Sequence, residues 1–170
     1  SNSLLNRSPL AAAVAWYLAI LLLGMLVFPI TRNVLRGLPD MGYGFSRLVG
    51  LLLLAYFTFI ISSLGGTFSR FTIIGVLVVL VIVSLVLVVK QKESLLAEIR
   101  ARKKVFLAIE IVFLILFLID LGIRIGNPDL WHPWKGGEKP MDLSYFTAVL
   151  KSTTFPPYDP WYSGGYINYY

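Results

Sequence analysis

The chain has 170 residues, of which 57% are hydrophobic and only 14% are charged, and its mean hydropathy is +0.77. This balance excludes an ordinary soluble domain and is typical of a protein that lies in a lipid bilayer. The net charge is +6, but the basic residues cluster beside apolar segments, which indicates contact with anionic lipid and no nucleic-acid binding. The absence of cysteine excludes disulfides, thiolate catalysis and cysteine-bound metal clusters.

Four apolar windows are long enough to cross a membrane, because a helix needs about 20 residues to span the hydrocarbon layer. The windows are Leu10–Ile30, Phe45–Leu64, Phe71–Val89 and Val105–Ile125. Valine and isoleucine favour strands in water, but in lipid the backbone must satisfy its own hydrogen bonds, so the valine-rich third window also forms a helix. The sequence predicts an all-α, multispanning membrane helix bundle with four transmembrane helices, followed by an external loop that carries a short amphipathic helix.

The connections between the windows differ in length and character. Residues 65–70 (GGTFSR) allow only a tight antiparallel hairpin between the second and third helices. The loop Lys90–Lys104 places Leu95, Leu96 and Ile99 on one face and basic residues on the other, which predicts a short amphipathic helix. We expect this helix to lie on the anionic cytoplasmic leaflet.

The distribution of lysine and arginine predicts the orientation of the chain. One set of basic residues falls in or beside the first and third loops: Arg32, Arg36, Arg47, Lys90, Lys92, Arg100, Arg102, Lys103 and Lys104. The other set is Arg7, Arg70, Arg124, Lys135, Lys139 and Lys151. Because cytoplasmic loops carry the excess of positive charge, loops 31–44 and 90–104 are predicted to be cytoplasmic. The N-terminus and the C-terminal loop then face outside.

Three ionisable residues fall within the fourth window, where charges are costly and have a partner or a function. Asp120 and Arg124 are four residues apart, so they lie on one helix face and are expected to form a local ion pair. Glu110 lies about one and a half turns beyond Lys104. It either reaches the cytoplasmic face or bonds to a neighbouring helix, and we interpret it as a packing or coupling residue, not a catalyst.

The sequence becomes polar and aromatic after the fourth window. Trp131 and Trp134 flank His132, and aromatic rings of this kind anchor a chain at the membrane interface. A single histidine is a poor signal for a metal site. We therefore interpret the three residues as an interfacial anchor.

A short helix is predicted to follow, lying flat on the outer membrane surface. Pro140 suits the first turn of a helix, and the apolar residues of MDLSYFTAVLKS share one face. Glu138, Lys139 and Asp142 stand at its start, where carboxylates complement the positive end of the helix.

The segment FPPYDPWYSGG, with three prolines and two glycines, breaks regular structure. Asp159 can fix a turn before Trp161, and the tyrosines can form an aromatic belt. Taken together, carboxylates, lysine and aromatic rings in one external loop also suit a site for a polar headgroup or a sugar. Structure and binding therefore both remain open for this segment.

Several motifs occur in an order that resembles a known family. NPD, EKPMD, FPPYDPW and GGYINYY closely resemble the YYY-type membrane proteins of archaea and Chloroflexi, a family named for its tyrosine run. LPDMGYGFSRLVGLLL resembles the loop between that family's first two helices, so the resemblance extends from about Pro29 to the end. The family is similar to the GT-C glycosyltransferases, multispanning enzymes that take sugar from a polyprenyl-phosphate donor. The resemblance implies an N-terminal three-helix region at 1–104 and, at 105–170, the start of a GT-C core.

The resemblance also implies an enzyme site in the external loop. Glycosyl transfer needs a carboxylate that removes the proton of the acceptor hydroxyl, and Glu138 or Asp142 is the implied base. The implied substrate-binding residues are Arg124 and Lys139 at the phosphate, Asp159 as a positioning or metal-binding group, and Trp161, Tyr169 and Tyr170 among the aromatic residues. No cofactor is evident in the sequence, and a divalent metal is left open.

Family members are much longer, and this chain ends within the tyrosine motif. We expect either the N-terminal membrane portion of such a transferase, inactive alone, or a shortened relative without catalysis. The alternative is a noncatalytic accessory subunit that packs against a larger respiratory or photosynthetic membrane complex. A transporter or channel ranks third, because no helix is broken by proline or glycine near its centre. The expected partners are membrane lipids, a polyprenyl-phosphate sugar or such a complex.

Overall fold

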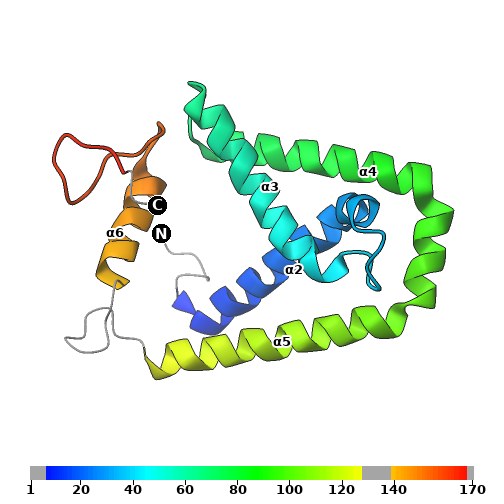
Figure 1. Ribbon diagram of the computed structural model, residues 1–170. Helices are drawn as coiled ribbons and strands as arrows, with labels where there is room; N and C mark the ends of the chain where they lie inside the picture. Colours follow the sequence, from blue (N-terminus) through cyan, green and yellow to red (C-terminus); the bar gives the residue numbers. More distant parts are fainter. Residues whose placement is uncertain (1–6, 128–138, 168–170) are drawn as a thin grey trace. The chain divides into compact units, whose positions relative to one another are not determined.

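The computed structural model describes residues 7–127 and 139–167, which form five helices with the labels of Figure 1. Their bounds are Pro9–Val34 for α2, Tyr43–Ser63 for α3, Arg70–Ala101 for α4, Lys103–Gly126 for α5 and Lys139–Lys151 for α6. The first four are long and apolar enough to cross a membrane, which confirms the all-α, multispanning fold class.

Each of the four long helices begins one or two residues before its predicted apolar window, and α2, α4 and α5 also end beyond their windows, whereas α3 ends at Ser63, one residue short. At the start of α2, the Ser8 hydroxyl accepts a hydrogen bond from the Ala11 amide at 3.2 Å, and Pro9 occupies the first turn, where its missing amide hydrogen is not needed. The helix also continues past Pro29, and the Asn33 side chain donates to the Pro29 carbonyl at 2.8 Å.

The predicted amphipathic helix at 90–104 is present as a continuation of α4. Gln91 has a non-helical backbone (φ −124°, ψ 17°), and α4 changes direction there (Figure 1). Residues 92–101 follow as a helical stretch that we call the bent segment. On its predicted apolar face Leu95 is buried, whereas Leu96 and Ile99 stay exposed.

Arg102, directly after the bent segment, connects two loops. Its guanidinium donates to the carbonyls of Leu38, at 3.3 Å, and Pro39, which belong to the connection between α2 and α3. The two loops predicted to be cytoplasmic therefore lie at the same end of their part of the structure.

The chain forms two compact units, residues 1–55 with 77–119 and residues 56–76 with 120–170. In the first unit, the rings of Phe28, Tyr43 and Phe106 meet edge to face with centroids between 4.6 and 5.5 Å apart. The division into an N-terminal region and a GT-C-like core at residue 105 follows from the resemblance and remains a prediction.

In the second unit, the chain after α6 packs on the connection between α3 and α4. The Phe155 ring lies 5.7 Å from that of Phe59 and 4.8 Å from that of Phe68, edge to face in both cases. The Phe68 amide donates to the Thr153 carbonyl at 2.8 Å. These contacts position the end of α6 and the aromatic loop that follows it.

Candidate functional site

The first turn of α6 carries the acidic group that was predicted as a candidate base. Asp142 lies there and is exposed, at the end of the helix where backbone amides favour a negative charge. The Ser144 hydroxyl donates to the Met141 carbonyl at 2.7 Å. The other candidate base, Glu138, lies outside the described residues, as do Tyr169 and Tyr170.

The loop after α6 is closed by backbone hydrogen bonds. The Asp159 amide donates to the Gly165 carbonyl at 2.9 Å, and the rings of Tyr158 and Tyr166 stack with centroids 4.9 Å apart. A hydrogen bond with Tyr158 raises the pKa of Tyr166 above its usual value. The Asp159 carboxylate accepts a hydrogen bond from the Trp161 amide at 2.8 Å, so Asp159 does fix a turn.

Trp161 attaches this loop to α6. Its indole nitrogen donates to the Ser144 hydroxyl at 2.6 Å. Beside this bond lies a cavity of about 340 Å³, lined by one face of α6 from Pro140 to Lys151 and by Pro160. The structure thus brings the helix and the aromatic loop together around a space that carries a hydroxyl and an ammonium group.

The two predicted phosphate-binding residues make local contacts. Arg124 pairs with Asp120 at 2.9 Å, which confirms the expected ion pair within the helix, and both side chains are largely exposed. The Lys139 ammonium donates to the Asn127 carbonyl at 3.4 Å. Trp131, His132 and Trp134, the predicted anchor, lie outside the described residues.

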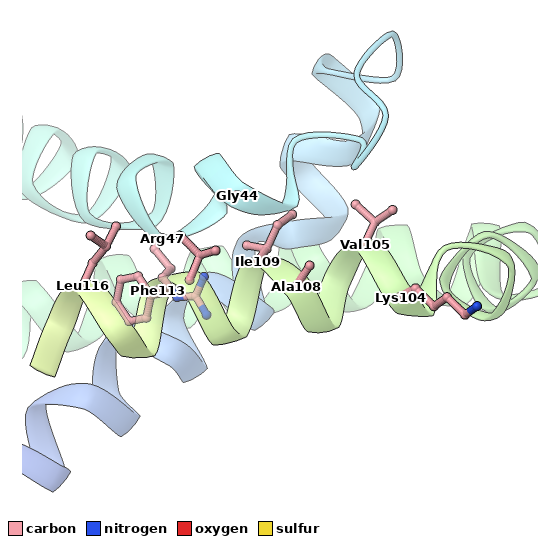
Figure 2. Close-up of a pocket in the computed structure, with 9 residues that line it drawn as sticks. Gly44, Arg47, Lys104, Val105, Ala108, Ile109, Phe113 and Leu116 are labelled. Atoms are coloured by element: carbon pink, nitrogen blue, oxygen red, sulfur yellow. The ribbon is translucent and has the colours of Figure 1, made fainter.

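A second polar cluster, between α3 and α5, was missed at the level of sequence. The Arg47 guanidinium contacts both carboxylate oxygens of Glu110 at 2.5 Å, and the Tyr43 hydroxyl donates to the same carboxylate. The guanidinium also lies 4.1 Å from the centre of the Phe113 ring, beside which Figure 2 shows Arg47. Glu110 therefore bonds to a neighbouring helix, the second of its two predicted behaviours.

The Arg47 side chain fits between the helices because α2 has a glycine at the point of contact. A Cβ atom on Gly24 would lie 2.6 Å from Cγ of Arg47, closer than two carbon atoms can approach. The Arg47 side chain is only 7% exposed. A signal for this cluster was present in the sequence: Arg47 lies inside the second apolar window, and Glu110 is a charge of opposite sign inside the fourth.

A third polar cluster fixes the bent segment to α2. The buried Arg32 guanidinium donates to Glu98 at 2.6 Å, to Ser94 at 3.1 Å and to Gln91. Gln91 in turn donates to Asn33 at 3.1 Å. All of these contacts lie at the bend of α4, so the cluster holds the bend in place.

Most of the chain is similar to one known protein family. The model of a family described as uncharacterized membrane protein (DUF2298) matches residues 53–170, more than half of the chain. The chain belongs to the DUF2298 family. No curated protein and no solved structure matches it.

The DUF2298 match begins within α3 and includes α6, the aromatic loop and Glu110, whereas Arg47 precedes it. Membership and the four apolar helices together make the protein an integral, multi-pass membrane protein. Among the described residues of this DUF2298 chain, no group of three or more His, Asp or Glu side chains could hold a metal ion.

Proposed function

We propose that this DUF2298 chain is the N-terminal membrane portion of a glycosyltransferase that takes sugar from a polyprenyl-phosphate donor and is inactive alone. The observation that carries the proposal is the cavity on α6. Its lining runs from Pro140, in the first turn of α6 that also bears Asp142, to Lys151 in the last turn, and it includes Pro160 of the loop that follows α6. A hydroxyl and an ammonium group line this space, a carboxylate lies elsewhere in the first turn of the same helix, and aromatic rings lie in the adjoining loop, which supports a sugar phosphate as the ligand.

The reaction transfers one proton, forms one bond at the anomeric carbon of the sugar and breaks another. The acceptor hydroxyl oxygen attacks the anomeric carbon, the bond from that carbon to the phosphate oxygen breaks, and the phosphate leaves with the electron pair. The hydroxyl proton passes to a carboxylate, for which Asp142 and Glu138 are the candidates. The charge that grows on the phosphate needs a cation nearby.

The contacts of the basic residues make them unequal candidates for the cation beside the phosphate. Lys151 lines the cavity and can face a phosphate there, whereas Lys139 lies in the first turn of α6 and donates to the Asn127 carbonyl. The guanidinium of Arg124 is paired with Asp120, which makes it the weaker candidate. Asp159 is assigned a positioning role, because its carboxylate holds the Trp161 backbone. Tyr169 and Tyr170 remain candidate sugar contacts from the resemblance.

The test measures sugar transfer by the native protein. Membrane vesicles that contain it are supplied with labelled polyprenyl-phosphate mannose or glucose. Asp142→Asn or Glu138→Gln, whichever removes the base, should lower transfer by about a hundredfold or more. Glu93→Gln, an exposed carboxylate of the bent segment, is the matched control and should change transfer less than twofold. Undiminished transfer in both single variants and in the double variant would rule out the assignment.

The proposal also requires that α6 lies outside the cell, with residues 31–44 and 90–104 in the cytoplasm of a prokaryote. The chain has no cysteine, so single introduced cysteines can report the side directly. Ser163→Cys should react with an impermeant maleimide in intact cells, whereas Gly37→Cys should react only after the cells are opened. The reverse pattern would contradict the proposed orientation.

A second candidate is a noncatalytic accessory subunit of a larger respiratory or photosynthetic membrane complex. The observation that favours it is that α5 has no buried residue in the described structure. Such a helix can pack against another membrane protein as well as against lipid. Isolation of the native protein in fixed stoichiometry with a redox or pigment complex would support this alternative, and its isolation without such a complex would contradict it.

A further inference from the structure

A groove of about 560 Å³ runs along α5 in the first compact unit (Figure 2). Lys104 lies at one end of it and Leu116 at the other, and the α5 residues that line it between them are apolar. Gly44 and Arg47 of α3 line the opposite side. The groove is therefore an open, apolar surface groove along a transmembrane helix, with a cation at one end.

The groove owes its depth to small residues. Gly44 has no side chain, and Ala108 presents only a methyl group on the α5 side. A large side chain at position 108 would occupy the space. The neighbouring Leu107 does not line the groove and is 60% exposed, so it offers a matched position for comparison.

The length of the groove corresponds to one leaflet of a bilayer. Lys104 and Leu116 are twelve residues apart, which on an α-helix is about 18 Å. Half of the hydrocarbon core is about 15 Å thick. An acyl chain that starts at the interface beside Lys104 therefore ends near Leu116.

The charges at the groove favour an anionic headgroup. Glu110 neutralises Arg47 deeper in the groove. The carboxylate of Asp40, near the mouth, accepts hydrogen bonds from the amides of Gly42 and Gly44. Among the ion pairs of the described residues, none joins Lys104 to a carboxylate, so its positive charge remains available at the mouth.

We propose that this groove binds one acidic phospholipid, with the phosphate at Lys104 and one acyl chain along α5 as far as Leu116. A zwitterionic lipid brings its own cation to the mouth and gains less from Lys104. The proposal does not depend on the proposed transferase activity, because it uses no residue of the α6 cavity.

The test is native mass spectrometry of the detergent-purified full chain, titrated with dioleoyl phosphatidylglycerol, with dioleoyl phosphatidylcholine or with inorganic phosphate. We expect one phosphatidylglycerol to remain bound at concentrations at which neither of the other two is retained. Lys104→Gln should weaken its binding about fivefold. Lys103→Gln, the adjacent exposed lysine that does not line the groove, should weaken it less than twofold.

The apolar half of the site is tested by filling the groove. Ala108→Phe should abolish retention of the lipid, whereas Leu107→Phe should leave it unchanged. Should Ala108→Phe prevent folding, the lysine pair alone still decides the question, because both lysines are exposed. Equal retention of the two lipids, retention of inorganic phosphate, or equal effects of the two lysine variants would overturn the proposal.

Discussion

Arg47 and Arg124 both pair with a carboxylate of α5, but their side chains are 7% and 75% exposed. Arg47 is held by the Glu110 carboxylate, which also accepts a hydrogen bond from the Tyr43 hydroxyl, and by the Phe113 ring, and it joins two helices. Within the part of the chain that the structure describes, Arg124 pairs with Asp120, one turn away on its own helix. The first pair therefore belongs to the packing of the bundle, and the second contributes little to stability.

The same contrast separates the two compact units. In the first unit, charged groups bond across helices and are withdrawn from solvent, as for Arg32 and Arg47. In the second, the polar groups of α6 bond within the helix or to the segments that adjoin it in the chain, and Asp142 and Trp161 stay exposed. Charges that hold helices together are poorly placed to bind a substrate, and for this reason the proposed transferase site is assigned to the second unit.

Among the variants that test the contrast between the buried and the exposed ion pair, Glu110→Gln is expected to have the largest effect. The change leaves the buried Arg47 without a compensating charge and should cost about 2–3 kcal/mol of unfolding free energy, less than a fully buried pair because Glu110 is a quarter exposed. Asp120→Asn is the matched control and should cost less than about 1 kcal/mol. Reversible unfolding in mixed micelles measures both.

The double variant Arg47→Met with Glu110→Leu extends this measurement. Because both charges are then gone, the loss should be much smaller than for Glu110→Gln alone. Equal destabilisation by Glu110→Gln and Asp120→Asn would mean that burial does not distinguish the two ion pairs.

A smaller effect is expected where α2 makes room for Arg47. Gly24→Ala places a methyl group against Cγ of Arg47 and should cost about 1–2 kcal/mol through overpacking. Gly75 has no atom within 4 Å of the same added methyl, so Gly75→Ala should be neutral or stabilising by up to about 1 kcal/mol. Thermal unfolding in detergent compares the two, and a harmless Gly24→Ala would show that the helices can separate slightly.

The smallest effect should come from the exposed loop. Trp161→Phe removes the hydrogen bond to Ser144 and should cost less than about 1 kcal/mol of unfolding free energy. Cleavage of residues 155–167 by protease should nevertheless become faster, because the loop loses an attachment to α6. An unchanged cleavage rate would show that the contacts of Phe155 suffice to hold it.

The four transmembrane helices follow from the sequence, because the backbone of a long apolar segment in lipid must satisfy its own hydrogen bonds, and a helix does so. The bend of α4 did not follow, although a separate amphipathic helix near it was predicted. Its position at Gln91 depends on Arg32, which lies 59 residues earlier and reaches it only in the folded bundle. A contact of this kind leaves no periodic pattern along the chain.

The candidate site shows the same limit. The local features of the external segment were predictable: a helix with Asp142 in its first turn, and a turn fixed by Asp159. The cavity was not, because it depends on the placement of Trp161 against Ser144. Arg47 was counted only as a topological charge, although its place within an apolar window could have paired it with Glu110.

The ion pair between α3 and α5 has a consequence for synthesis of the protein. A carboxylate in an isolated apolar helix opposes its entry into the bilayer from the translocon by about 2.5–3.5 kcal/mol. Arg47 precedes Glu110 in the chain, so the helix that carries the arginine leaves the ribosome first. Arg47 can therefore serve as the counter-ion of Glu110 when α5 reaches the translocon. Insertion of α5 into the lipid then depends on α3.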